Sequence, residues 1–242
     1  MLLEIGDKTL EIQAGIPGTV TRLIPEYGAE ITAHGALIQG VWGNSRLNFG
    51  MLFPLLAAPD DTLDIKQLDV SLRGTVILSG TCSDPNVLQA AEELPVRGII
   101  LGSIDPMLLT LAAQVSYPII VIDGIGRRPL NNLAYRLLTT NAKHEVSLNT
   151  SPYDRHAGSR PEILIPLPAS QALTAPHDME QLAPGHQVRV CRAPNTGEIG
   201  TFMKIRPGLT SLPSGLRTAA GEVNLEKGGR IVVPLANLEV IG

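Results

Sequence analysis

The sequence is poor in aromatic residues, and this shortage excludes one class of partner. Only 3% of the 242 residues are Phe, Trp or Tyr, whereas 44% are hydrophobic. The core must therefore be built from aliphatic side chains. Proteins that hold single-stranded nucleic acid stack successive bases on aromatic rings, and this chain has too few rings for such a platform. The low charged fraction, 17%, and the high apolar fraction together indicate a packed globular chain.

Cysteines and long apolar runs are scarce as well. The two cysteines, Cys82 and Cys191, form no motif, which favours buried free thiols in a reducing compartment. No stretch reaches the ~18 consecutive apolar residues that a membrane span requires. Glu4, Asp7 and Glu11 stand where a signal peptide carries basic residues and then an apolar run. We therefore expect a cytoplasmic protein without a membrane partner.

Three apolar runs organise the middle of the chain. They cover residues 74–80, 97–102 and 117–123, and within each run the apolar residues are continuous and do not alternate with polar ones. Continuous runs are typical of strands buried on both faces, as in a parallel sheet with crossover helices. The sequence therefore predicts a three-layer α/β centre with a mostly parallel sheet.

Helices are predicted between and after these strands. Asp84-Pro85 and Asp105-Pro106 each place a capping carboxylate before a proline at the first helical position. A third helix is predicted to begin near Pro129. In the second helix, four apolar residues share one side at helical spacing and are expected to face the sheet: Leu108, Leu111, Ala112 and Val115.

Short strands separated by glycines precede this centre. Leu3-Glu4-Ile5 and Leu10-Glu11-Ile12 alternate on either side of Gly6-Asp7-Lys8, which predicts a hairpin. Ile16-Pro17-Gly18-Thr19-Val20 and the turn after it resemble the barrel-sandwich repeat of biotinyl and lipoyl domains. The resemblance implies a small β barrel or sandwich over residues 1–56. Lipoyl domains modify a lysine at a hairpin tip, but no Glu stands three residues before Lys8, so we carry over the fold alone and expect no cofactor.

The most specific motif lies near the C-terminus, after a proline-containing linker at residues 169–184. Residues 185–205 read as a strand, a loop with Pro194 and Gly197, and a second strand. This stretch resembles the KOW motif of transcription-elongation and ribosomal proteins. The order of segments along the chain is similar to that of uncharacterised bacterial KOW-domain-containing proteins.

The KOW resemblance implies a domain organisation and a contact loop. It implies an SH3-like β barrel over residues 185–242, which follows an α/β domain over residues 57–168. In that family the loop of the motif binds RNA or protein. The resemblance therefore implies contacts through four loop residues: Arg192, Asn195, Thr196 and Glu198.

The carboxyl ends of the predicted strands are the default place for a ligand in an open α/β sheet. Five polar or charged residues fall there: Ser103, Asp105, Asp123, Arg127 and Arg128. The two adjacent arginines either hold an anionic ligand such as a phosphate or carboxylate, or pair with the two aspartates. Gly124-Ile125-Gly126 lacks the third glycine of a dinucleotide-binding fingerprint because Pro129 occupies that position. A tight strand-to-helix turn is the favoured interpretation of these glycines.

We find no complete catalytic or metal-binding set in the sequence. Cys82 has no evident histidine base, and the five histidines have no ligand spacing. These observations favour a non-enzymatic binding or assembly protein, whose KOW-like module contacts a protein partner, over an enzyme. One alternative is an α/β domain that binds or transforms an anionic small molecule at the strand ends. The other is an RNA-, ribosome- or transcription-associated factor.

The distribution of charge bears on the RNA alternative. Residues 184–242 contain seven Lys or Arg and four Glu, a net charge of +3, and since the whole chain carries −4, the remainder carries −7. Non-specific affinity for nucleic acid comes almost entirely from cations that contact phosphates. We therefore expect weak or no binding to nucleic acid.

Overall fold

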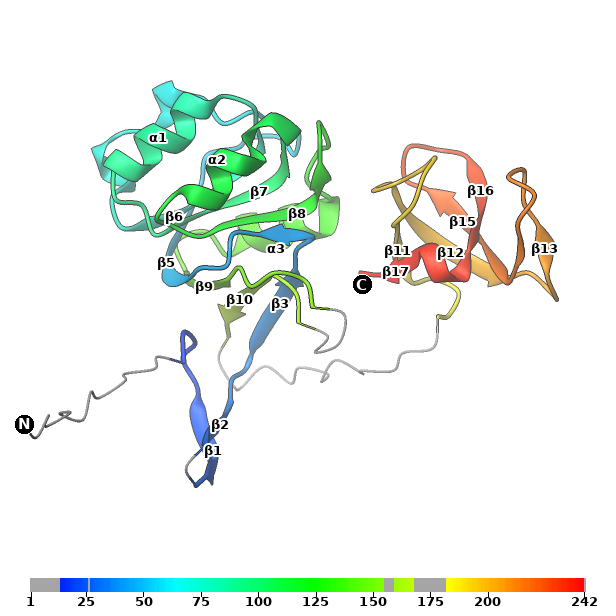
Figure 1. Ribbon diagram of the computed structural model, residues 1–242, viewed down its shortest axis with the longest axis horizontal. Coiled ribbons are helices and arrows are strands. Elements are labelled where there is room, and N and C mark those ends of the chain that lie inside the picture. The colour runs from blue at the N-terminus through cyan, green and yellow to red at the C-terminus, as the bar shows by residue number, and fades with distance from the viewer. Residues whose placement is uncertain (1–13, 26, 155–158, 168–181, 242) are drawn as a thin grey trace, which may run out of the picture.

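The computed structural model describes residues 14–25, 27–154, 159–167 and 182–241. Figure 1 shows a larger α/β body, a smaller β body beside it, and a hairpin that projects from the larger body. The hairpin predicted around Lys8 lies outside the described residues. None of the helices in the described ranges combines the length and the apolar character that a membrane span needs.

An eight-stranded mixed sheet forms the larger body. Its strand order is β3-β10-β9-β5-β6-β7-β8-β4. The bounds are β3 (Gly35–Gln39), β4 (Trp42–Gly43), β5 (Leu47–Pro54), β6 (Thr75–Cys82), β7 (Gly98–Ile104), β8 (Ile119–Ile125), β9 (Glu145–Asn149) and β10 (Glu162–Pro166).

The three predicted apolar runs form β6, β7 and β8, which pair in parallel and confirm the α/β centre. The expectation of a mostly parallel sheet is wrong. Only β5 joins these strands in parallel, and the other four neighbouring pairs are antiparallel. The antiparallel partners are short strands from elsewhere in the chain, and local pattern does not reveal their neighbours.

The described N-terminal residues do not form the separate barrel predicted for residues 1–56. Strands β1 (Thr19–Ile24) and β2 (Gly28–Thr32) form a two-stranded hairpin of their own. Strands β3, β4 and β5 belong to the central sheet instead. Their register partners are far away in the sequence: Leu37 lies opposite Leu164, and Phe49 lies opposite Ser147. The expected domain boundary after residue 56 therefore falls inside one sheet.

Helices cover both faces of this sheet, as the three-layer prediction requires. Helices α1 (Pro85–Glu93) and α2 (Leu109–Gln114) lie on one face, and α3 (Asn132–Thr140) lies on the other (Figure 1). Three short 3-10 turns, η1 (Ile65–Gln67), η2 (Val70–Leu72) and η3 (Pro106–Leu108), complete the unit.

The helix ends follow from their capping residues. Asp84 accepts a hydrogen bond from the Asn86 backbone and caps α1, and Asp105 caps η3 in the same way, both as predicted. Helix α3 is capped by Asn131 and so begins three residues later than Pro129. Leu111, which was expected to face the sheet, packs against the core beneath α1 and α2 but is only partly buried.

The smaller body is an antiparallel sheet with the order β16-β15-β12-β11-β17. The bounds are β11 (Gln187–Val190), β12 (Ile199–Ile205), β15 (Ala220–Leu225), β16 (Arg230–Pro234) and β17 (Leu238–Val240). Strands β13 (Thr210–Ser211) and β14 (Arg217–Thr218) form a separate small hairpin, and a 3-10 turn, η4 (Leu235–Asn237), precedes β17. Val188, Phe202, Val223 and Leu225 form its own core, and Leu182 packs against them. This unit therefore begins by residue 182, earlier than the predicted 185.

We predict that Leu88→Ala destabilises the larger body by about 2–5 kcal/mol, the usual cost of emptying a buried leucine site. Leu88 on α1 is fully buried in the core beneath that helix. Leu133→Ala on α3 is the control, because 48% of that side chain is exposed. Chemical denaturation measures both. A loss below about 0.5 kcal/mol for Leu88→Ala would contradict the packing described here.

Candidate functional site

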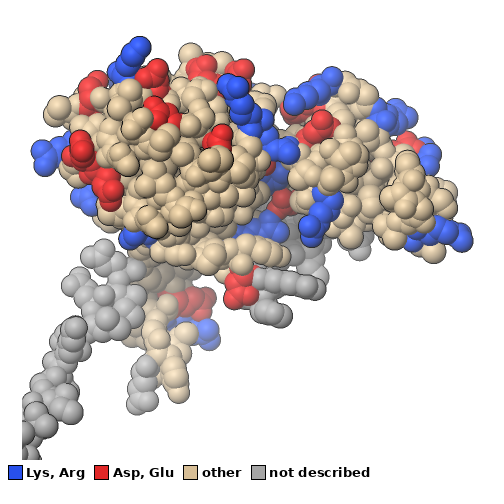
Figure 2. All heavy atoms as spheres, turned by 45° about the horizontal axis from the view of Figure 1, so that its top comes forward, with Lys and Arg blue, Asp and Glu red and all other residues tan. Residues whose placement is uncertain are grey.

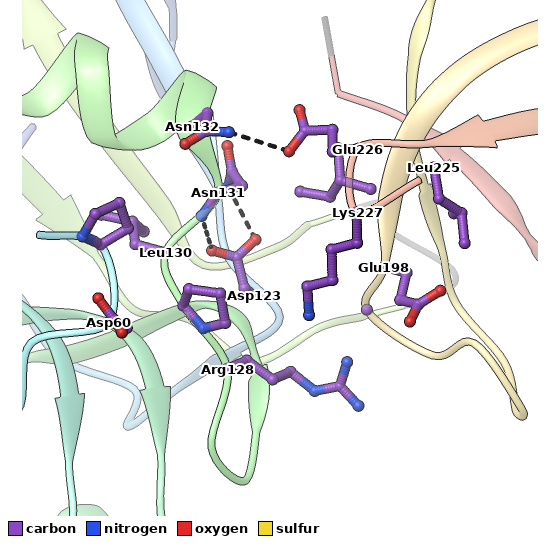
Figure 3. Close-up of a pocket in the computed structure, with 14 residues that line it drawn as sticks. Asp60, Asp123, Arg128, Leu130, Asn131, Asn132, Glu198, Leu225, Glu226 and Lys227 are labelled. Carbon is purple, nitrogen blue, oxygen red and sulfur yellow. Dashed lines mark hydrogen bonds between the residues drawn. The ribbon is translucent and has the colours of Figure 1, made fainter. Parts of the chain in front are cut away.

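A cavity of about 320 Å³ lies between the two bodies, at the carboxyl ends of the central strands. The larger body contributes the turn after β8 and the start of α3, and the smaller body contributes the turns that precede β12 and β16 (Figure 3). This is the edge where the sequence places the candidate ligand residues. The C-terminal unit therefore covers a large part of the predicted site.

A buried arginine of the smaller body holds this junction together. Arg189 on β11 is only 5% exposed and reaches the end of β8. Its Nη1 donates a hydrogen bond of 2.5 Å to the Ile122 carbonyl and lies 3.5 Å from Asp123 Oδ1. Its Nε donates to Glu239 Oε2 at 3.1 Å from β17, the neighbouring strand. The guanidinium thus links two sheets through charged and backbone acceptors.

The acceptor Asp123 is held in place by its own body. Asn131 donates to both carboxylate oxygens of Asp123, from its backbone at 2.8 Å and from its side-chain amide at 2.9 Å. Burial raises the pKa of Asp123, while the Asn131 hydrogen bonds and then the charges of Arg189 and Arg128 act in the opposite direction. Burial lowers the pKa of Arg189, which Asp123 counteracts. The attraction between the two charges and their hydrogen bonds offsets the cost of removing each charge from water.

A second contact crosses the junction at Arg128. Its guanidinium donates a hydrogen bond to the carbonyl of Thr196, in the loop between β11 and β12. The next residue, Gly197, has φ +79°, and a Cβ there would collide with the same guanidinium. Glycine suits this position for two reasons. It adopts the left-handed conformation readily, and its missing Cβ leaves room for the Arg128 guanidinium. Asn132 at the start of α3 also donates to Glu226 at 3.1 Å.

The remaining candidate ligand residues serve the local backbone or face solvent. Ser103 is fully buried, and its Oγ donates to the Arg128 carbonyl at 2.7 Å and accepts from the Arg128 backbone at 3.1 Å. Asp105 accepts from the Met107 backbone as the η3 cap. Arg127 is exposed and forms no ion pair with any residue that the structure describes. The structure thus brings Ser103, Asp123 and Arg128 together, and leaves Asp105 and Arg127 outside that cluster.

Of the four loop residues implied by the KOW resemblance, three are engaged. The Thr196 carbonyl accepts from Arg128, and Asn195 donates to Glu198 Oε2 at 2.9 Å within the loop. Glu198 also lines the cavity. Arg192 is exposed in the same loop. The loop therefore contacts the protein's own α/β unit.

The charges around the cavity do not suit an anion. Four carboxylates line it against two cations, Arg128 and Lys227. Figure 3 shows both cations reaching into the space between the bodies, with carboxylates of both bodies around them. Asp123 is already balanced by Arg189, which leaves three acidic side chains against the two basic ones. An anionic ligand would meet net repulsion here.

The thiol at the end of β6 is buried away from solvent, which does not suit a nucleophile. Cys82 is fully buried, and burial raises the pKa of its thiol to about 11. A thiol with this pKa stays protonated at neutral pH, and only the thiolate form attacks. Cys191, in contrast, is exposed, so the expectation of two buried thiols is wrong for this residue. Within the described ranges, no group of three His, Cys, Asp or Glu side chains is arranged to hold a metal ion.

Two functional residues were missed by sequence reasoning. Arg189 and Glu239 each stand in a short alternating strand, where a charged residue normally faces water. The local sequence holds no signal that a second body covers that face, and only the packing of the two sheets reveals it.

Comparison of the chain with protein-family models, with curated protein sequences and with solved structures finds no match.

We predict that Arg189→Met destabilises the protein by about 3–5 kcal/mol, because it leaves a buried carboxylate without its cation. Adding Asp123→Asn to that variant should recover part of the loss. The matched control is Arg22→Met on the β1–β2 hairpin, where Arg22 pairs with Glu30 at 3.0 Å but both side chains are more than half exposed. That pair should contribute at most about 1 kcal/mol. If the effects of Arg189→Met and Asp123→Asn on the free energy of unfolding simply added up in the double variant, Arg189 and Asp123 would not form a coupled buried pair.

Proposed function

We propose that this chain is a non-enzymatic binding protein that assembles with another protein. The observation that carries the proposal is the β1–β2 hairpin, which leaves the body as a sheet of only two strands (Figure 1). Strand β1 and the turn after it expose apolar side chains: Val20, Leu23, Ile24 and Tyr27, with Leu23 73% and Tyr27 89% exposed.

A hairpin of this kind is poorly stable alone. Two strands without a covered apolar face are at best marginally stable in water. Each strand of the hairpin also has one edge without a partner strand in the described part of the chain. Such an edge can pair with an extended segment of another protein, while the exposed side chains supply apolar contact. A protein partner that covers the hairpin meets both needs.

The C-terminal unit has a supporting role in this proposal. Its five strands in the order β16-β15-β12-β11-β17, with a 3-10 turn before the last strand, support the SH3-like barrel that the KOW resemblance implies. Its loop is used within the chain, since Thr196 and Gly197 dock on Arg128. We propose that the barrel docks on the larger body, from which the hairpin projects, and that Arg192, which is exposed in the loop, remains open to a protein partner.

The alternative of an anionic ligand at the strand ends receives less support. The carboxylates outnumber the cations around the cavity, and Arg128 is committed to the Thr196 carbonyl. The C-terminal unit also occupies the edge from which a substrate would approach. We therefore retain the assembly role as the proposed function.

The hairpin proposal predicts a surface-specific loss of binding. Affinity purification of the tagged protein from its native cell, followed by quantitative mass spectrometry, should recover a partner with the wild-type chain. A Leu23→Asp/Tyr27→Asp variant should lose this partner. The matched control is Val70→Asp/Met107→Asp, which places the same charges on two equally exposed apolar residues of the larger body. A partner retained by the hairpin variant, or lost equally with the control, would count against the proposal.

The proposal also predicts that nucleic acid is not the partner. Three of the cations of the smaller body, Lys204, Arg206 and Arg230, surround one glutamate, Glu222, at 3.8, 3.2 and 3.7 Å. On the face shown in Figure 2, blue basic and red acidic side chains are interspersed over both bodies. Phosphate contacts therefore compete with internal ion pairs.

We expect RNA and DNA to bind no more tightly than about 10⁻⁴–10⁻⁶ M at physiological salt, the range of non-specific contacts. Fluorescence anisotropy measures this directly. Sub-micromolar binding that weakens in Arg192→Ala, while Arg22→Ala binds as the wild type does, would favour the nucleic-acid alternative instead.

A further inference from the structure

One carboxylate of the smaller body is surrounded by three cations. Glu222 on β15 is only 7% exposed. Three basic side chains lie within 3.8 Å of its oxygens: Lys204, Arg206 and Arg230. We call these three residues the basic cluster. Three positive charges against one negative charge leave a net charge of +2 at this place on the surface.

Most of the donors of the basic cluster are not used by Glu222. Arg206 Nε donates a hydrogen bond to its Oε1 at 3.2 Å. Arg230 Nη1 and Lys204 Nζ lie 3.7 and 3.8 Å from its Oε2, which is beyond the length of a hydrogen bond. The side chains of Lys204 and Arg230 are 63% and 60% exposed, and neither has another ion-pair partner among the described residues. Their N–H groups are therefore available to acceptors of another molecule.

The strand register places the basic cluster on the outer face of the smaller sheet. Phe202 lies opposite Val223, and both belong to the core. After a β-bulge, Lys204 lies opposite Glu222. Because Val223 points into the core, its neighbour Glu222 points away from it. Strand β16 brings Arg230 to Glu222 from the other side of β15. The cluster is thus built on three neighbouring strands.

The ribbon of β12 and β15 continues beyond the basic cluster into the β13–β14 hairpin. The Arg206 backbone donates to the Ala220 carbonyl at 2.9 Å, and β13 then pairs with β14. This hairpin lies on the side of the smaller body away from the larger body (Figure 1). Leu209 and Leu216, which precede its two strands, are 63% and 54% exposed, and the next residue, Arg217, is exposed as well. The hairpin therefore adds a fourth cation and two apolar side chains.

The chemistry of this surface matches an acidic segment of a protein. The four cations and Glu222 carry a net charge of +3, which suits a segment with two or three carboxylates. The two leucines suit an apolar side chain of the same segment. Nucleic acid matches less well, because its affinity grows with the number of phosphates contacted. In addition, the sequence between Lys204 and Arg230 contains no aromatic residue on which a base could stack.

We propose that the basic cluster and the β13–β14 hairpin bind an acidic segment of a partner protein. Carboxylates of the segment pair with Lys204, Arg217 and Arg230, and its apolar side chains pack against Leu209 and Leu216. This site goes beyond the proposed assembly role of the β1–β2 hairpin and does not depend on it, because that hairpin projects from the larger body.

Fluorescence anisotropy with the full chain and labelled peptides tests the proposal. The probe is amidated, fluorescein-labelled Gly-Asp-Leu-Glu-Leu-Asp-Gly, and its neutral counterpart is Gly-Asn-Leu-Gln-Leu-Asn-Gly. We expect the acidic peptide to bind about tenfold more tightly than the neutral one at low ionic strength, because only the acidic peptide forms ion pairs. Its affinity should fall as salt is added, since salt screens exposed charges.

Paired substitutions then locate the site. Lys204→Gln/Arg230→Gln should weaken binding of the acidic peptide by about fivefold or more, because two of the pairing cations are lost. The matched control is Lys66→Gln/Arg73→Gln, which removes two exposed cations from the larger body and so changes the net charge equally. The control should bind within about twofold of the wild type. Arg206 still pairs with the buried carboxylate in both variants, and circular dichroism melting verifies that they are folded.

A third variant tests the apolar contact. Leu209→Ser/Leu216→Ser should weaken binding of the acidic peptide by about threefold or more, since apolar surface no longer leaves water on binding. The same variant should bind Gly-Asp-Ser-Glu-Ser-Asp-Gly, which lacks the leucines, as the wild type does. An equal effect on both peptides would show that Leu209 and Leu216 do not contact the segment.

Three further outcomes would overturn the proposal. The first is no binding of the acidic peptide at about 1 mM, or equal affinity for the acidic and neutral peptides. The second is an equal loss in Lys204→Gln/Arg230→Gln and in the control, which would show that net charge and not the basic cluster attracts the peptide. The third is tighter binding of octauridylate than of the acidic peptide, weakened by the same variant, which would assign the cluster to nucleic acid.

Discussion

The buried guanidinium of Arg189 is the interaction on which the arrangement of the two bodies depends. A cation removed from water needs acceptors that recover its hydration energy. Arg189 finds them on both sides of the junction: the Ile122 carbonyl and Asp123 in the larger body, and Glu239 in its own. If the bodies separated, Asp123 would remain buried without its cation. The junction is therefore specified by charge and geometry more than by apolar area.

This junction determines which surfaces remain for a partner. The strand ends where an open α/β sheet usually holds a ligand are faced by the loop that contains Thr196 and Gly197. Exposed apolar side chains include those of strand β1 and the turn after it, and Leu47, Phe49 and Met51 on β5. The loop of the C-terminal unit thus contacts the α/β unit of the same chain, and the β1–β2 hairpin is the surface that we propose for assembly.

Elements with a strong local signal were predictable from the sequence. The continuous apolar runs define β6, β7 and β8, and aspartate followed by proline marks the starts of α1 and η3. The strand, loop and second strand predicted within residues 185–205 were also recognisable, and they correspond to β11, the loop after it, and β12.

Features that depend on distant pairing were not predictable. Nothing local to residues 35–54 shows that these strands complete the central sheet and do not close a barrel, since the choice depends on partners more than 90 residues away, such as Leu164 and Ser147. The candidate site shows the same limit. Asp123 and Arg128 were identified because they follow a buried strand, but the residue that binds Asp123, Arg189, comes from another body whose approach has no local signature.

The most direct test of the account is whether the two bodies move as one. Backbone ¹⁵N relaxation gives a separate rotational correlation time for residues of the α/β unit and for residues of the C-terminal unit. We expect one shared correlation time in the wild-type protein and two shorter, unequal times in Arg189→Met. Two different correlation times in the wild type would contradict a junction fixed by the Arg189–Asp123 pair.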